Sequence, residues 1–214
     1  MFTTMEIKDK NQIGGNKIKP MKILVLAPMK LECNNFKNAI KQIDTQNEYK
    51  VVECGIGKVN AASIVTLEIL NTEYDLVAVI GYAAASGKFE LGDVVIPNKT
   101  CYHDTRIDEG IADELLMMHD LSGPEEVTIL TGDCFVNKDL SESLQERFGD
   151  SVIFDMETCA IAQICSDYSI PVMAIKLISD IPTAGHNERS FLDFVAENKC
   201  FEPMVAFLEL VNNP

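Results

Sequence analysis

The chain has 214 residues, of which 47% are hydrophobic and 24% charged, a composition typical of one soluble globular domain with a substantial core. Its net charge of -15 argues against nucleic acid or an anionic membrane as a partner, because both bind basic surfaces. No stretch reaches the roughly 18 apolar residues of a membrane span, and the N-terminus lacks an apolar signal core, so we expect a cytoplasmic protein.

The cysteines and histidines give no sign of a metal or a disulfide framework. The seven cysteines are scattered, odd in number and never arranged as Cys-x-x-Cys, so we expect reduced and mostly buried thiols. The three histidines lie far apart in the sequence. We therefore expect neither a metal site nor another cofactor.

Apolar runs alternate with helical patterns along most of the chain. Residues 1–20 are polar without sustained periodicity, and we expect a loose extension before a single domain at 21–214. Apolar runs predict strands at 22–27, 49–54, 76–80, 94–96, 127–130, 151–154 and 172–178. Helical patterns predict helices at 29–43, 61–70, 111–119, 140–148, 159–168 and 189–210. The order predicts an α/β fold, a three-layer αβα sandwich with a mixed, largely parallel central sheet.

Acidic residues follow two of these strands. Asp155-Met156-Glu157 separates the run at 151–154 from the next helix, and Ser179-Asp180 ends the run at 172–178. We expect the two strands to be neighbours whose acidic ends face one crevice. Ligands of such sheets bind beyond the carboxyl ends of the strands.

Three further features fall at predicted strand ends. Glu32 follows the first strand, where it either serves a ligand or complements the dipole of its helix. Phe135 follows the strand at 127–130 and is placed either to stack on a planar ligand or to join the core. The small residues of 81–87 predict a tight turn.

These residue types together indicate a chemistry. Carboxylates suit general acid–base work and hydrogen bonds to sugar hydroxyls, and nearby negative charge stabilises an oxocarbenium-like transition state. An aromatic platform beside hydroxyl-binding acids fits a nucleoside. The residues therefore predict a protein that binds a nucleoside and cleaves its glycosidic bond.

Several motifs carry a family resemblance that runs from Met21 nearly to the end of the chain. They are the run 21–32 (MKILVLAPMKLE), Gly55-Ile56-Gly57-Lys58-Val59, Gly92-Asp93, Tyr102-His103-Asp104, Gly132-Asp133-Cys134-Phe135, Asp155-Met156-Glu157 and Ile178-Ser179-Asp180. In order and spacing, the chain resembles the 5′-methylthioadenosine/S-adenosylhomocysteine nucleosidases of the nucleoside phosphorylase-like superfamily.

The resemblance implies a reaction and residues for it. Such enzymes hydrolyse the N-glycosidic bond of a 5′-substituted adenosine and release adenine. Asp180 would protonate N7 of the adenine and Ser179 would orient that acid. Glu32 would activate the attacking water.

The resemblance also implies how substrate is held. Glu157 would bind a ribose hydroxyl beside Met156. Phe135 would stack on the purine, and the backbone of Val136 would hydrogen-bond to its edge. Phe191 matches an aromatic residue that lines the family's 5′ pocket.

The chain departs from the family pattern at three places. Tyr82-Ala83-Ala84-Ala85 replaces the usual Ser-Ala-Gly-Gly, and Tyr82 would stand beside the ribose or the water. Lys176 replaces an arginine, and the segment after 101–108, which reaches across a dimer in the family, is shortened. A homodimer is still expected from the resemblance.

Two alternatives stay open. The same fold hosts purine nucleoside phosphorylases, which hold phosphate with arginines, and this chain has only Arg106, Arg147 and Arg189. The replacements Tyr82 and Lys176 would also fit a nucleoside-binding module that has lost turnover.

Overall fold

The computed structural model describes residues 19–105, 118–197, 205, 208–209 and 211. Most of the predicted N-terminal extension lies outside these residues, and the extension and the single domain stay predictions. The predicted helix at 111–119 also lies outside them, except for its last two residues. Of these, His119 begins a short strand, β6 (His119–Asp120), instead of ending a helix.

One sheet contains the nine strands of the described residues. Their bounds are β1 (Lys22–Ala27), β2 (Glu48–Glu53), β3 (Leu76–Ala85), β4 (Val94–Val95), β5 (Pro97–Tyr102), β6 (His119–Asp120), β7 (Glu125–Thr131), β8 (Val152–Asp155) and β9 (Val172–Asp180). The order is β2-β1-β3-β8-β7-β5-β6, and β9 pairs with both β3 and β4. β1–β2, β1–β3, β3–β9, β7–β8 and β5–β7 are parallel, whereas β3–β8, β4–β9 and β5–β6 are antiparallel. The predicted mixed, largely parallel sheet is confirmed.

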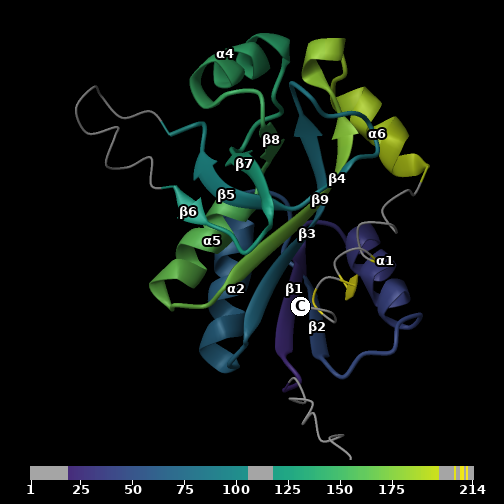
Figure 1. Cartoon of the computed structure of the whole chain (residues 1–214), viewed down its shortest axis with the longest axis vertical. Helices are drawn as coiled ribbons and strands as arrows, with labels where there is room; N and C mark the ends of the chain where they lie inside the picture. Colours follow the sequence, from purple (N-terminus) through teal and green to yellow (C-terminus); the bar gives the residue numbers. More distant parts are fainter. Residues whose placement is uncertain (1–18, 106–117, 198–204, 206–207, 210, 212–214) are drawn as a thin grey trace, which may run out of the picture.

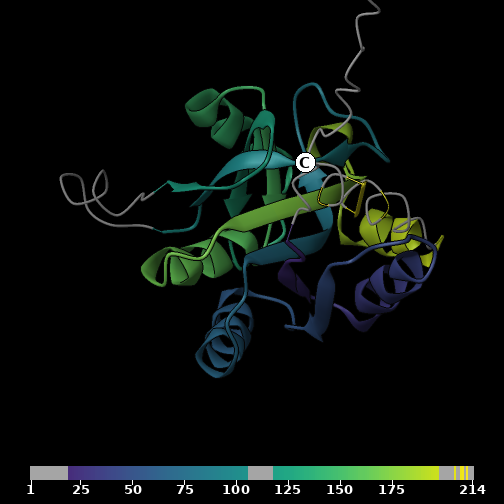
Figure 2. The ribbon, with the colours of Figure 1, turned by 60° about the horizontal axis from the view of Figure 1, so that its bottom comes forward.

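Helices cover both faces of this sheet. They are α1 (Lys30–Ile40), α2 (Lys58–Asn71), α4 (Lys138–Phe148), α5 (Thr158–Asp167) and α6 (Glu188–Ala196). α1 and α6 lie on one side of the sheet and α2 and α5 on the other, which gives the predicted three layers (Figures 1 and 2). The part of the predicted last helix beyond 197 lies largely outside the described residues. Within the described residues, no helix is both long and apolar enough to cross a bilayer.

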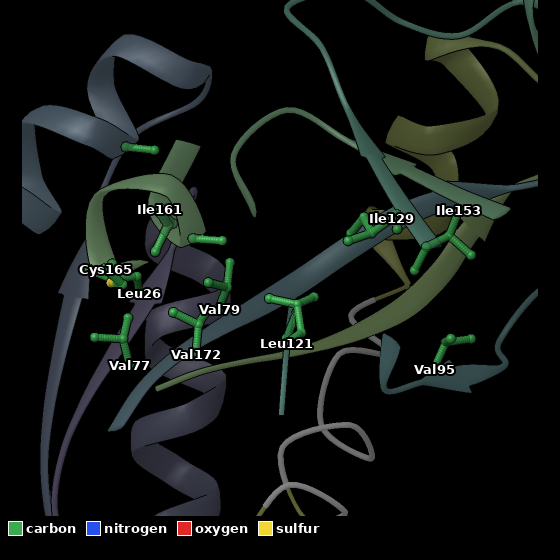
Figure 3. Packing of buried hydrophobic residues seen from close by; sticks show 14 of the residues in the cluster. Leu26, Val77, Val79, Val95, Leu121, Ile129, Ile153, Ile161, Cys165 and Val172 are labelled. Carbon is green, nitrogen blue, oxygen red and sulfur yellow. The ribbon is translucent and has the colours of Figure 1, made fainter. Parts of the chain in front are cut away.

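Strand β3 joins the two halves of the hydrophobic core. Val77 and Val79 face the cluster beneath α2 and α5, where Ile161 and Cys165 pack (Figure 3). The alternate residues of β3, including Ile80, belong to the cluster beneath α1 and α6. Because both faces are covered, nearly every side chain of β3 is apolar or small and buried, as expected for a central strand.

Two details of the predicted sheet are wrong. The segment 81–87 was expected to turn, but β3 continues through Ala85 because its second half pairs with both β9 and β8. The strands β8 and β9 were expected to be neighbours, but β3 lies between them. Their acidic ends nevertheless approach each other across β3, since Ala84 pairs with both Phe154 and Asp180.

A buried ion pair crosses β3 at this point. Lys176 Nζ of β9 lies 2.9 Å from Asp155 Oδ2 of β8, and both side chains are almost fully buried. Asp155 also accepts hydrogen bonds from the Thr131 hydroxyl, at 2.6 Å, and from the Thr158 backbone N–H, at 3.0 Å. Burial opposes ionisation of Asp155, yet Lys176 and these donors together hold its pKa below the ordinary value. The acid therefore caps α5 and fastens two strands at once.

Replacing Lys176 with Met should be strongly destabilising. The change would leave the Asp155 carboxylate buried without its counterion, and breaking such a pair on one side costs about 3–5 kcal/mol. Urea unfolding monitored by circular dichroism measures the loss. Adding Asp155→Asn to Lys176→Met should recover part of it, because the stranded charge is then gone.

The matched control is Lys50→Met. Lys50 Nζ pairs with Glu68 at 2.6 Å, but its side chain is 49% exposed, so its loss should cost less than about 1 kcal/mol. Equal losses for Lys50→Met and Lys176→Met would contradict the importance assigned to the buried pair.

Candidate active site

The carboxyl ends of six strands surround one pocket. Its lining comes from the residues after β1, β2, β7 and β8, from the last residues of β3, β8 and β9, and from α1 and α6. The empty volume is about 650 Å³, which includes the solvent at its mouth. All nine residues predicted from the sequence line it, namely Glu32, Tyr82, Phe135, Val136, Met156, Glu157, Ser179, Asp180 and Phe191. The structure thus brings them together, while their individual roles stay predictions.

Glu32 is held by backbone donors from two elements. It lies in the first turn of α1 and is almost fully buried. The Met29 N–H donates to Oε2 at 2.8 Å, and the Tyr82 N–H donates to Oε1 at 3.1 Å. Burial raises the pKa of Glu32 from 4.5 to about 7, against the opposing effects of Lys176 and the two N–H groups. The carboxyl group can therefore exchange a proton near neutral pH.

Gly81 makes room for this carboxylate. Its φ of +143° is a conformation that other residues rarely adopt, and a Cβ there would collide with Glu32 Oε1. The absence of a side chain at Gly81 lets β3 pass directly beneath the acid. The glycine thus serves a close approach inside a strand, and not the turn that the sequence predicted.

Glu157 enters the pocket from the start of α5. The Gly57 N–H donates to its Oε1 at 2.9 Å, which joins two residues one hundred positions apart. Burial and, second to it, the nearby Asp155 carboxylate raise the pKa of Glu157 to about 7, against the opposing effects of Lys176 and the Gly57 N–H. The Gly-x-Gly motif therefore supports a carboxylate, a role different from the phosphate contact such motifs often make.

Asp180 is the last residue of β9 and is 3% exposed. The Ser179 hydroxyl lies 2.8 Å from Asp180 Oδ1 and 3.2 Å from the Ala83 carbonyl oxygen, and it can donate to either. Burial raises the pKa of Asp180 above its ordinary value, although Ser179 and His186 act in the opposite direction. The acid thus has a neighbour that fixes its orientation and an environment that favours its protonated form.

Aromatic rings form the other side of the pocket. Phe135 is 48% exposed, so the alternative that it belongs to the core is wrong, whereas Val136 beside it is buried. The Phe191 ring lies 5.8 Å from that of Phe135. The Tyr82 ring packs edge-on against Phe191 and Phe194, at 5.9 and 6.2 Å. Apolar rings thus face the carboxylates.

A charged network fixes the rim. Lys58 Nζ lies 2.7 Å from Asp104 Oδ2 and 3.6 Å from Asp133 Oδ2. The Lys58 N–H donates to Asp133 Oδ1 at 2.9 Å, and the Asp133 N–H donates to Asp104 Oδ2 at 2.9 Å. The turn that carries Gly57 is thereby tied to the loop that carries Phe135.

Several of these contributions were missed from the sequence. The resemblance identifies Lys176 only as a replacement for an arginine, although a lone lysine inside the apolar run of β9 is a sign of a buried partner. The carboxylate-holding role of Gly57 had no sequence signal, because its partner is remote along the chain. Among the described residues, no cluster of three or more histidines, cysteines or acids has the arrangement of a metal site.

Comparison with known proteins places this geometry in a family. The model of the phosphorylase superfamily matches residues 36–126 and 123–202. The 5′-methylthioadenosine/S-adenosylhomocysteine nucleosidase of Baumannia cicadellinicola is 32% identical over 67% of this chain and 72% of its own. That of Buchnera aphidicola (from Acyrthosiphon pisum, strain APS) is 30% identical over 82% of this chain and 93% of its own.

Solved structures agree with the sequence relatives. The S. pneumoniae nucleosidase with the transition-state inhibitor MT-ImmA is 26% identical, with a TM-score of 0.71 over 88% of this chain and 98% of that one. The Arabidopsis thaliana 5′-methylthioadenosine nucleosidase is 18% identical, with a TM-score of 0.78 over 92% and 98%. The chain therefore belongs to the phosphorylase superfamily and, within it, to the 5′-methylthioadenosine/S-adenosylhomocysteine nucleosidases.

Proposed function

We propose that this protein hydrolyses the N-glycosidic bond of a 5′-substituted adenosine and releases adenine. The observation that carries the proposal is one pocket in which three buried acids, Glu32, Glu157 and Asp180, face an exposed aromatic ring, Phe135. The activity named for the relatives supports it. The candidate substrates are those that the relatives' names print, 5′-methylthioadenosine, S-adenosylhomocysteine or both.

Asp180 is the proposed acid. Its burial favours the protonated form, and a proton given to N7 lets the adenine leave as a neutral base. The Ser179 hydroxyl, 2.8 Å away, holds the carboxyl group toward the base. Departure of the base leaves positive charge on the ribose, which nearby carboxylates stabilise.

Glu32 is the proposed base that activates water. Its two N–H contacts, from Met29 and Tyr82, fix both oxygens, so the carboxylate has little freedom to turn away. With a pKa of about 7, it is partly ionised at neutral pH and can accept the proton of the attacking water.

The remaining residues hold the substrate. One oxygen of Glu157 accepts a hydrogen bond from a ribose hydroxyl beside Met156, while the other keeps the hydrogen bond from the Gly57 N–H. Phe135 stacks on the purine, and the backbone of Val136 bonds to its edge. Phe191 lines the space for the 5′ substituent.

Water is favoured over phosphate as the second substrate. Among the described residues that line the pocket, none is an arginine or a lysine, and the buried Lys176 is paired with Asp155. A phosphorylase needs cations to hold phosphate. A nucleoside-binding module is supported less, because a binder needs no acid and base poised around the glycosidic bond.

A homodimer and a cytoplasmic location complete the proposal. Ile56, Val59, Leu67 and Leu70 are exposed apolar residues on one side of α2 and the turn before it, a stripe that supports contact with a second copy. The six described cysteines are free thiols, which supports a reducing compartment.

Asp180→Asn should abolish turnover while leaving nucleoside binding largely intact. The amide keeps the shape of the side chain but cannot donate the proton, which costs about 10²- to 10⁴-fold in kcat. Adenine release from 5′-methylthioadenosine, with and without phosphate, measures the reaction, and calorimetry measures binding. Normal turnover by Asp180→Asn would remove it as the acid, and a strict phosphate requirement would make the enzyme a phosphorylase. Asp150→Asn, on the exposed loop before β8, is the control.

The pH dependence of kcat/KM should follow the ionisation of Glu32. If its ionised form accepts a proton from water, kcat/KM should rise about tenfold per pH unit below 7 and level off above it. Glu32→Gln should be inactive at every pH. A wild-type profile that is flat between pH 5 and 8 would contradict the assignment.

Stability gives an independent readout of the same group. The pKa of Glu32 is about 7 when folded and near 4.5 when unfolded, so the folded protein binds this proton more tightly. The stability that the protonated group provides is complete below pH 4.5 and is lost as pH rises to 7, by about 3 kcal/mol. Glu32→Gln should lack this part of the pH dependence in urea unfolding.

The Lys58 network should affect binding more than chemistry. Lys58→Met would release Asp104 and Asp133 and loosen the loop carrying Phe135, so we expect KM to rise about tenfold with little change in kcat. Lys138→Met is the matched control, because Lys138 pairs with Glu142 on the exposed face of α4. A fall in kcat at unchanged KM would contradict this role for Lys58.

A further inference from the structure

Four aromatic rings from three elements form one continuous wall. Tyr82 on β3 contacts Phe191 and Phe194 on α6, and Phe191 contacts Phe135 on the loop after β7. Tyr82, Phe191 and Phe135 line the pocket, and Phe194 packs behind Tyr82. Because Tyr82 is 6% exposed and Phe135 is 48% exposed, the wall runs from the buried end of the pocket to its mouth. We call these four residues the aromatic wall.

Tyr82 stands between the site of water activation and α6. Its backbone N–H holds Glu32 Oε1 at 3.1 Å, while its ring lies 5.9 Å from that of Phe191. If the anomeric carbon of the substrate lies beside Glu32 and its 5′ carbon lies beside Phe191, the ring of Tyr82 occupies the space into which a long 5′ substituent would extend. A serine at this position, as in the family pattern, would leave that space open.

The charge of the pocket adds a second restriction. Among the described residues that line it, the groups that can carry a charge at neutral pH are all carboxyl groups: Glu32, Asp155, Glu157 and Asp180. The cation closest in sequence to the wall, Arg189, is 80% exposed and pairs with Asp193 at 3.1 Å. The described lining residues therefore offer no cation to a substituent that carries its own carboxylate, and burying that carboxylate against the apolar rings would cost much free energy.

We propose that Tyr82 is a specificity-determining residue that limits the enzyme to adenosines with a short, uncharged 5′ substituent. The inference rests on the proposed function and narrows it. Methylthioadenosine, whose substituent is one thioether and one methyl group, fits this description. S-adenosylhomocysteine, whose substituent ends in an ammonium and a carboxylate, does not.

The test compares kcat/KM for the two nucleosides. The wild-type enzyme should favour methylthioadenosine by at least about 50-fold, since the ring of Tyr82 would exclude a longer substituent and the described lining offers no cation to a charged one. Tyr82→Ser should reduce this ratio at least about tenfold by opening the end of the pocket. Tyr82→Phe should keep the ratio, because the ring remains. Tyr168→Ser, an exposed tyrosine after α5, is the matched control and should keep the wild-type ratio.

A substrate series keeps the test independent of the folding of Tyr82→Ser. For the wild-type enzyme, kcat/KM should fall as the 5′ thioether lengthens from methyl to butyl, and should fall again when the end is charged. Equal rates for all substituents, or a Tyr82→Ser enzyme with an unchanged ratio, would overturn the specificity role while leaving the hydrolase intact. Absence of adenine from every nucleoside would instead overturn the proposed function itself.

Discussion

The ion pair between Lys176 and Asp155 is the constraint on which the electrostatics of the pocket depend. A fully buried ammonium requires a counterion, and Asp155 supplies it at 2.9 Å from the far side of β3. Because Asp155 largely neutralises the charge of Lys176, that lysine offsets only part of the pKa increase that burial causes in Glu32 and Glu157. Their pKa values therefore rise to about 7. A pair that fastens two strands thus also leaves two acids able to exchange protons at neutral pH.

Backbone groups, which cannot rotate away, hold these acids in place. Met29 and Tyr82 donate to Glu32, and Gly57 donates to Glu157. Met29 follows β1, Tyr82 lies in the second half of β3, and Gly57 lies in the turn before α2. The orientation of the carboxylates is therefore set by folding and needs little reorganisation during a reaction. In such a site, a change in strand pairing would alter the chemistry as much as a change of side chain.

Local patterns in the sequence predicted much of the fold and which residues meet. The apolar run of β1 and the acids at the ends of β8 and β9 were informative. The carboxyl ends of β8 and β9 meet because both strands pair with Ala84 near the end of β3, although β8 runs antiparallel to β3 and β9 parallel to it. The extension of β3 through Gly81 could not be predicted, since small residues also favour turns and only pairing with β8 and β9 makes this segment a strand. The partner of Lys176 was equally hidden, because the contact joins residues that only the completed sheet brings together.

The opposition of acids and rings explains how one pocket can treat the parts of a nucleoside differently. A purine covering Phe135 would bury a ring that is now 48% exposed, a gain of about 1–3 kcal/mol. Phe135 stands on a loop that the Asp133–Lys58 contact ties to the turn carrying Gly57. The Gly57 N–H in turn holds the Glu157 carboxylate. Binding energy from the base would therefore be available to order Glu157, the carboxylate proposed to bind the sugar. The apolar side needs no such coupling, because the ring of Tyr82 already packs against α6 in the folded protein. The proposed selection of the 5′ substituent would therefore need no rearrangement on binding.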